Sequence, residues 1–182
     1  MSISRHDALI VVDAQNDFLP GGLLPVEDGN RIFRAINAIA PSFSTVYFTR
    51  DWPAPGTNLT RFHPMPGTNG AEFSPLIDRG NAVGVIDKSG EEFSPFPGTG
   101  LADELKRRDI RRVFVCGLAT DYCIKATALD ARANGFDVTV VLDGVAAYDL
   151  EPDDEAKALD EMRAAGVALT ESGVLLVLPA RP

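Results

Sequence analysis

The segment VFVCGLATDYCIKATALDA, residues 113–131, decides the fold. It opens with a short apolar run and closes with an alanine-rich stretch, and only a short turn separates the two. This order predicts a buried strand that turns directly into a helix. Cys123 then lies in the first turn of that helix, where free backbone N–H groups and the helix dipole favour a thiolate. Cys116 falls inside the strand, which predicts a small buried core residue.

Apolar runs alternate with helical patterns on both sides of this segment. We expect strands at residues 8–13, 45–49, 82–86, 113–117, 138–142 and 167–170, and helices at residues 30–40, 101–108, 121–134 and 155–165. Strands that alternate with helices in this way predict a parallel sheet covered on both faces, and therefore one α/β domain over residues 1–182. Residues 50–79 are rich in proline and glycine and too long for a simple connection, so we expect a lid or a site-building loop.

The composition narrows the class of protein. The chain has 182 residues, 45% of them hydrophobic, which is enough for one sizeable core. No apolar run approaches the ~18 residues of a membrane span, and the start of the chain is typical of a first strand rather than a signal peptide. Two cysteines make no disulfide framework, which favours a reducing cytoplasm. The net charge of −9 would repel nucleic-acid phosphates.

Polar side chains gather where the expected strands end. Those ends carry Asp13, Arg50, Asp51, Asp87, Lys88 and Asp143, and the fourth strand leads to Cys123. Open parallel sheets form their sites beyond these ends. There, Lys88 would keep the thiol of Cys123 ionised and orient the carboxylate of Asp13, which could then carry protons in place of a histidine. Taken singly, an aspartate after a strand is as readily a turn cap, and a lysine there is as readily solvated.

Five stretches, in this order, resemble the isochorismatase-like cysteine hydrolases, and among them the nicotinamidases. They are LIVVDAQNDFLPGGLLPV, FTRDW, PGTNGAEF, IDKS and VCGLATDYCIKATALDARANGFDVTVVLDG, and together the similarity covers most of the chain. The resemblance implies a three-layer α/β/α fold with a six-stranded, mainly parallel sheet.

The resemblance also implies the parts of an active site. It carries a catalytic triad over onto Asp13, Lys88 and Cys123. It implies a cis peptide between Leu118 and Ala119, and an oxyanion hole formed by the backbone N–H groups of Ala119 and Cys123. As substrate-binding side chains we expect Phe18, Arg61 and Phe62.

The sequence departs from the family at its metal site. Metal-containing nicotinamidases use one aspartate and three histidines, and the metal binds the ring nitrogen of the substrate. Asp51 and His63 match two of these ligands, but Pro53 and Thr57 stand where histidines belong. Two ligands are a poor site for zinc or iron. We therefore expect no tightly bound catalytic metal, with weak zinc, iron or manganese binding left open, and a substrate that is not anchored by a pyridine nitrogen.

Other side chains near this loop bear on the substrate. The family has an aromatic residue shortly before the position of His63, and Thr60 stands there in this chain. The other histidine, His6, precedes the first strand and is expected at the opposite end of the sheet. Arg50 and Arg61 would suit a substrate carboxylate, although both could equally pair with surface acids, which are plentiful at this net charge.

We interpret the chain as a cysteine-dependent, nicotinamidase-like amidohydrolase that converts a small amide to an acid and ammonia through a thioester. One alternative is a metal-free relative that acts on a linear amide, ureide or amidated acid, of the maleamate or carbamoyl amine type. A second is an inactive binding member of the family, and a third is a receiver-like or flavodoxin-like binding domain, which explains neither Cys123 nor the long loop. We expect a cytoplasmic homo-oligomer that binds a small amide and neither nucleic acid nor membrane.

Overall fold

A computed structural model describes residues 2–54, 63–89 and 92–176. A six-stranded sheet runs through it in the order β3-β2-β1-β4-β5-β6, and every neighbouring pair is parallel. The strands are β1 (Asp7–Val12), β2 (Thr45–Asp51), β3 (Gly84–Lys88), β4 (Arg112–Leu118), β5 (Asp137–Ala146) and β6 (Ala168–Thr170). The helices are α1 (Ile32–Ile39), α2 (Leu101–Arg107), α3 (Lys125–Ala133), α4 (Asp154–Ala164) and α5 (Ser172–Leu176).

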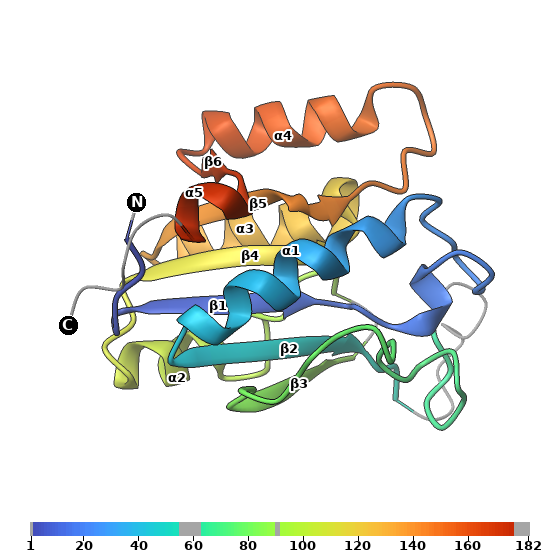
Figure 1. The fold of residues 1–182 in the computed structure, drawn as a ribbon, viewed down its shortest axis with the longest axis horizontal. Coiled ribbons are helices and arrows are strands. Elements are labelled where there is room, and N and C mark those ends of the chain that lie inside the picture. Colours follow the sequence, from blue (N-terminus) through green and yellow to red (C-terminus); the bar gives the residue numbers. More distant parts are fainter. Residues whose placement is uncertain (1, 55–62, 90–91, 177–182) are drawn as a thin grey trace.

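Helices cover both faces of the sheet, so the expected α/β/α layers are present (Figure 1). On one face, α1 and α5 pack on alternate residues of the central strands, such as Leu9 and Val11. On the other face, α2, α3 and α4 pack on the intervening residues, such as Ile10 and Val12. Because β1 is buried on both faces, its sequence is a continuous apolar run rather than an alternating one.

Most elements lie within a few residues of their expected places, and β5 is the main exception. It continues to Ala146, so Asp143 lies inside the strand and not at its end. The register of β4 against β5 shifts between Val115 and Gly117, which lets the two strands stay paired as far as Leu118 and Ala146. The Asp143 carboxylate instead accepts hydrogen bonds from the backbone N–H and the hydroxyl of Ser172, at the start of α5. That short helix had no counterpart in the sequence prediction.

The helix expected to start near Asp121 is divided into two parts. A π-helical turn, Thr120–Ile124, carries Cys123 and leads into α3. The helix ends as expected, at Asn134 followed by Gly135 with a φ of 92°. Single-turn π segments inside helices are frequent at functional sites because they re-aim one or two side chains. Among the described helices, none is long and apolar enough to cross a membrane.

The backbones of β4 and β1 approach each other closely at Gly117. Gly117 has a φ of 117°, and a Cβ atom there would lie 2.0 Å from the carbonyl oxygen of Val12. Only glycine therefore permits this approach. It brings the last residues of β4 beside Asp13, which follows β1 directly.

Candidate active site

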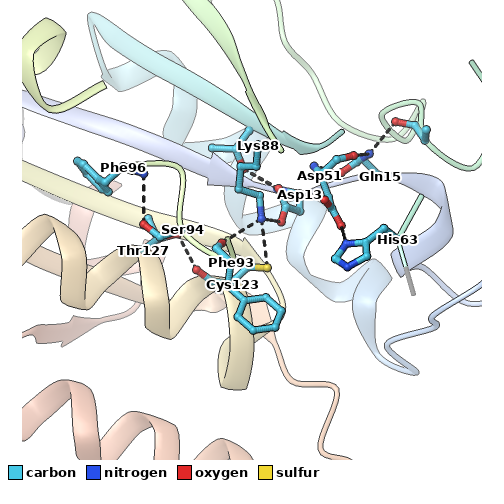
Figure 2. Close-up of polar contacts among 12 residues, drawn as sticks. Asp13, Gln15, Asp51, His63, Lys88, Phe93, Ser94, Phe96, Cys123 and Thr127 are labelled. Atoms are coloured by element: carbon cyan, nitrogen blue, oxygen red, sulfur yellow. Dashed lines mark hydrogen bonds and ion pairs between the residues drawn. The ribbon is translucent and has the colours of Figure 1, made fainter. Parts of the chain in front are cut away.

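Three side chains from separate strand ends meet at one edge of the sheet (Figure 2). The ammonium of Lys88, the last residue of β3, lies 2.6 Å from Asp13 Oδ2 and 3.3 Å from Cys123 Sγ. Its third hydrogen bond goes to the backbone oxygen of Phe93, at 2.9 Å. All three protons of the ammonium are therefore used, and the lysine links the carboxylate to the thiol.

Asp13 is held by its own set of contacts. It is 1% exposed and has a φ of 48°, a left-handed conformation that aspartate tolerates better than most residues. The Thr49 hydroxyl donates to Asp13 Oδ1 at 2.6 Å, while Lys88 occupies Oδ2. Both carboxylate oxygens thus have a partner, and the group can turn little.

The electrostatics of this cluster favour a charged lysine. Burial alone disfavours the ammonium of Lys88, but the Asp13 carboxylate and the Cys123 sulfur outweigh that effect and raise the pKa of Lys88. Burial raises the pKa of the Cys123 thiol, and the charge of Asp13 adds to this, while Lys88 opposes it. Burial and Lys88 thus act on the thiol in opposite directions, and a base beside the thiol would complete its activation.

The turn before Cys123 is fixed from several sides. The peptide bond between Leu118 and Ala119 is cis, as the resemblance implied. The carbonyl of Ala119 accepts the N–H groups of Tyr122 and Ile124, and the Thr127 hydroxyl donates to the Cys123 carbonyl at 2.6 Å. The N–H of Ala119 makes no hydrogen bond within the described part of the chain. Ala119 lines the same cavity as Cys123, where an oxyanion hole would need a hydrogen-bond donor.

The second cysteine behaves as expected. Cys116 is fully buried in β4, and burial raises the pKa of its thiol. It lies in the core cluster with α1, on the face away from the helix that follows Cys123.

A cavity of about 470 Å³ opens above the thiol. Its lining contains Phe18, Leu118 and Ala119 among the residues expected from the sequence. Arg61 and Phe62, the other two expected substrate contacts, lie outside the described residues. The structure adds an aromatic wall in which Phe93, Tyr122 and Tyr148 follow one another, with ring centroids 5.6 and 6.3 Å apart.

Asp121 secures one side of this wall. Its two carboxylate oxygens accept the backbone N–H groups of Tyr148 and Asp149, at 3.0 and 2.8 Å. The turn that carries Cys123 is thereby joined to the segment after β5 that brings Tyr148 and Leu150 to the cavity. A single sequence holds no signal for a contact that spans 27 residues.

Asp51 and His63 form a second polar pair in the same cavity (Figure 2). Asp51 Oδ2 lies 2.5 Å from His63 Nδ1, while Asp51 Oδ1 is buried without a hydrogen-bond partner among the described residues. Gln15, itself fully buried, holds the pair in place: its amide accepts from the N–H of Asp51 at 2.8 Å and donates to the Asp51 carbonyl at 3.0 Å. Burial, followed by the charge of Asp13, raises the pKa of Asp51.

These residues do not fit the metal site of the family. No group of three or more His, Cys, Asp or Glu side chains among the described residues could hold a metal ion. Residues 55–62, which lie outside that part, include none of these residue types, and Pro53 has no donor atom. Within the described part of residues 50–79, Asp51 and His63 line the cavity.

Two further polar side chains lie away from the cavity. Arg50 forms a two-pronged pair with Asp87, at 2.8 and 2.9 Å, and stacks on Trp52. This pair lies at the surface, and Arg50 does not line the cavity. His6 contacts Asp109 at the amino-terminal end of the sheet, as its sequence position predicted.

The chain is similar to known proteins over nearly its whole length. Residues 7–173 match the family described as the Isochorismatase domain. A nicotinamidase of Acinetobacter baylyi is 33% identical over 97% of this chain and 98% of its own. Among solved structures, PnC1 from L. infantum in complex with nicotinate has a TM-score of 0.87 and 33% identity, over 96% of this chain and 98% of that one. A pyrazinamidase of Pyrococcus horikoshii in complex with zinc has a TM-score of 0.81 and 38% identity, over 91% and 99%.

Proposed function

The chain belongs to the isochorismatase family, and on that premise we propose that its cavity hydrolyses a small carboxamide to a carboxylic acid and ammonia. The protein is a nicotinamidase-like amidohydrolase that acts on a non-peptide C–N bond. One observation carries the assignment: Lys88 joins a buried carboxylate and a thiol at the base of a cavity. A binding or receiver-like domain needs no such linked acid, base and nucleophile.

The chemistry begins at the thiol. Asp13 takes the proton of Cys123 as the sulfur attacks the carbonyl carbon, and Lys88 stabilises the thiolate that forms. The carbonyl oxygen becomes an oxyanion, which accepts hydrogen bonds from the N–H groups of Ala119 and Cys123, two residues of the cavity lining. Asp13 then gives its proton to the departing nitrogen, so the C–N bond breaks, ammonia leaves and a thioester remains.

A water molecule completes the reaction. Asp13 removes a proton from the water as its oxygen attacks the thioester carbonyl, and the C–S bond breaks with the proton returning to sulfur. The acid is released and the thiol is restored. Asp13 is suited to this double role because Thr49 and Lys88 fix both of its oxygens.

Nicotinamide is the first substrate to test because the relatives are nicotinamidases over nearly the whole chain. A second candidate is a metal-independent amidase for a linear amide, a ureide or an amidated acid. The incomplete metal site favours it, because a pyridine nitrogen lacks its usual metal partner here. An inactive binding member of the family would not need a complete triad, so the arrangement around Lys88 speaks against that alternative.

We place the protein in the cytoplasm as a homo-oligomer that binds a small amide and neither nucleic acid nor a membrane. Two free cysteines suit a reducing compartment, and a net charge of −9 disfavours contact with phosphate backbones.

The test is ammonia release from nicotinamide, pyrazinamide, maleamate and carbamoyl amines, with and without a thiol alkylator. Mass spectrometry of the quenched enzyme should show the acyl group on Cys123. Hydrolysis that persists after Cys123 is fully alkylated, or no hydrolysis of any amide in the panel, would overturn the proposed function.

A further inference from the structure

We propose that His63, held by Asp51, recognises a hydrogen-bond donor at the end of the substrate remote from the scissile amide. The substrate class is a small carboxamide that carries an N–H group at that end. This inference rests on the proposed amidase function and names the recognition chemistry of the same cavity.

The first step concerns the orientation of the imidazole. Its Nδ1 lies 2.5 Å from Asp51 Oδ2, and we assign the shared proton to Nδ1, which then donates it to the carboxylate. In a neutral ring, Nε2 is then an acceptor. Figure 2 shows His63 below Asp51 with its second ring nitrogen turned away from the carboxylate, and Nε2 has no hydrogen bond within the described residues. His63 lines the cavity, so this lone pair is offered to a ligand.

The second step is the rigidity of this arrangement. Asp51 is 5% exposed, and the side chain of Gln15 bonds both its N–H and its carbonyl, so the carboxylate sits on a fixed backbone. A fixed carboxylate in turn fixes the ring plane and the tautomer of His63. A hydrogen bond to a pre-oriented acceptor costs a ligand little ordering entropy and gives strong discrimination.

The third step is the balance of donors and acceptors. Lys88 is the one cation among the described lining residues, and its three protons are already taken by Asp13, Phe93 and Cys123. Glu92 adds a further carboxylate to the lining, and Asp51 keeps an oxygen without a described partner. Asp51 Oδ1 and His63 Nε2 therefore form a pair of acceptors at this end, which favours a ligand N–H there and disfavours a ligand carboxylate or a ring lone pair.

The test compares two amides of nearly equal shape. Pyrrole-3-carboxamide has a ring N–H, and furan-3-carboxamide has a ring oxygen in its place. Calorimetry on the Cys123→Ala variant measures binding without turnover, and we expect the pyrrole to bind about five- to tenfold more tightly, the effect of one hydrogen bond. His63→Phe in that background should abolish the preference, whereas His6→Phe, which alters the remote histidine, should leave it intact.

A second measurement does not depend on a folded His63 variant. With only two histidines in the chain, the ring nitrogens can be assigned by nitrogen-15 NMR. The pyrrole amide should shift the His63 Nε2 resonance in the direction of an accepted hydrogen bond, and the furan amide should not. Both measurements are made after chelation, so a metal contributes to neither.

The outcomes separate the two proposals. Equal binding of the two amides, no detectable binding of either, a preference that survives His63→Phe, or an unmoved Nε2 resonance would overturn the inference. A wild-type enzyme that hydrolyses nicotinamide with no preference for the pyrrole overturns the inference and leaves the amidase assignment standing. A pyrrole preference in binding, in a wild-type protein that hydrolyses no amide, overturns the amidase assignment instead.

Discussion

The cavity has two polar clusters that differ in how fully they are satisfied. In the first, Asp13 and Lys88 have a partner for each oxygen and each proton, all supplied by the protein. In the second, Asp51 and His63 contact each other, while Asp51 Oδ1 and His63 Nε2 have no partner among the described residues. The difference teaches that the reacting groups are pre-organised, whereas the recognition groups are left to be completed by a ligand.

The largest expected effect is at the nucleophile. Cys123→Ala should lower kcat by at least ~10⁴-fold, because no other group can form the thioester. Cys116→Ala is the matched control: it should keep activity and lose only about 1 kcal/mol of unfolding free energy, as a small truncation in the core does. Ammonia release and chemical denaturation measure the two quantities. Full activity of Cys123→Ala would remove the first cluster from the mechanism.

The proton carriers come next. Asp13→Asn and Lys88→Met should each reduce kcat by ~10²–10⁴-fold while circular dichroism shows a retained fold, because each removes one step of proton transfer or charge stabilisation. Asp87→Asn is the control, since Asp87 lies at the same sheet edge but pairs with Arg50 on the surface. A His63→Ala loss as large as that of Asp13→Asn would point to a cysteine–histidine mechanism instead.

The second cluster should give a smaller and different effect. His63→Ala should lower kcat/KM by about tenfold, mainly through KM, because the lost hydrogen bond binds the substrate and does not move the reacting proton. Steady-state kinetics on the best substrate of the panel measures the split, with His6→Ala as the control. A change confined to kcat would make His63 part of the chemistry and erase the distinction between the clusters.

The Asp51 carboxyl should affect how the unfolding free energy depends on pH. Burial raises its pKa, so the folded protein holds this proton more tightly than the unfolded chain does, and the stability it contributes is lost as pH rises through the raised value. The unfolding free energy of Asp51→Asn relative to the wild type should therefore rise between about pH 4 and pH 7. Denaturant titrations at both pH values measure it, with Asp87→Asn as the control. An unchanged difference at the two pH values would contradict the prediction.

Metal removal should have the smallest effect. We expect dialysis against a chelator to leave hydrolysis of the best substrate unchanged, because Asp51 and His63 are too few ligands for a catalytic ion. Metal analysis of the purified protein accompanies the assay. Stoichiometric zinc, iron or manganese, or nicotinamide hydrolysis that chelation abolishes, would make the second cluster a metal site after all.

Several parts of the site could be predicted because they follow from local sequence. Apolar runs between helical patterns predicted the parallel sheet, and parallel strands bring their carboxyl ends to one edge, which places Asp13, Lys88 and the turn before Cys123 together. Position within an element separated Cys123 from Cys116. The family resemblance added the cis peptide between Leu118 and Ala119.

Other parts depended on contacts between distant segments. No local sequence pattern indicates that the Gln15 side chain hydrogen-bonds the backbone of Asp51, or that the Thr49 hydroxyl donates to Asp13. The same is true of the hydrogen bond that Asp121 accepts from the backbone after β5. Likewise, the π-helical turn and the continuation of β5 beyond Asp143 arise from pairing and packing rather than from propensity. A single sequence shows which donors and acceptors exist, but not which of them meet.

The sequence by itself therefore determined the strands, the helices and the polar residues that follow each strand, because strand and helix periodicity are local properties. Only the tertiary structure decided how these groups are charged and partnered. It set the burial of Cys123 against the charge of Lys88, and it turned Arg50 toward Asp87 and away from the cavity. Burial and hydrogen bonding depend on which distant segments the fold brings into contact. They determine the protonation states of the site's residues and which donors and acceptors are left unpaired.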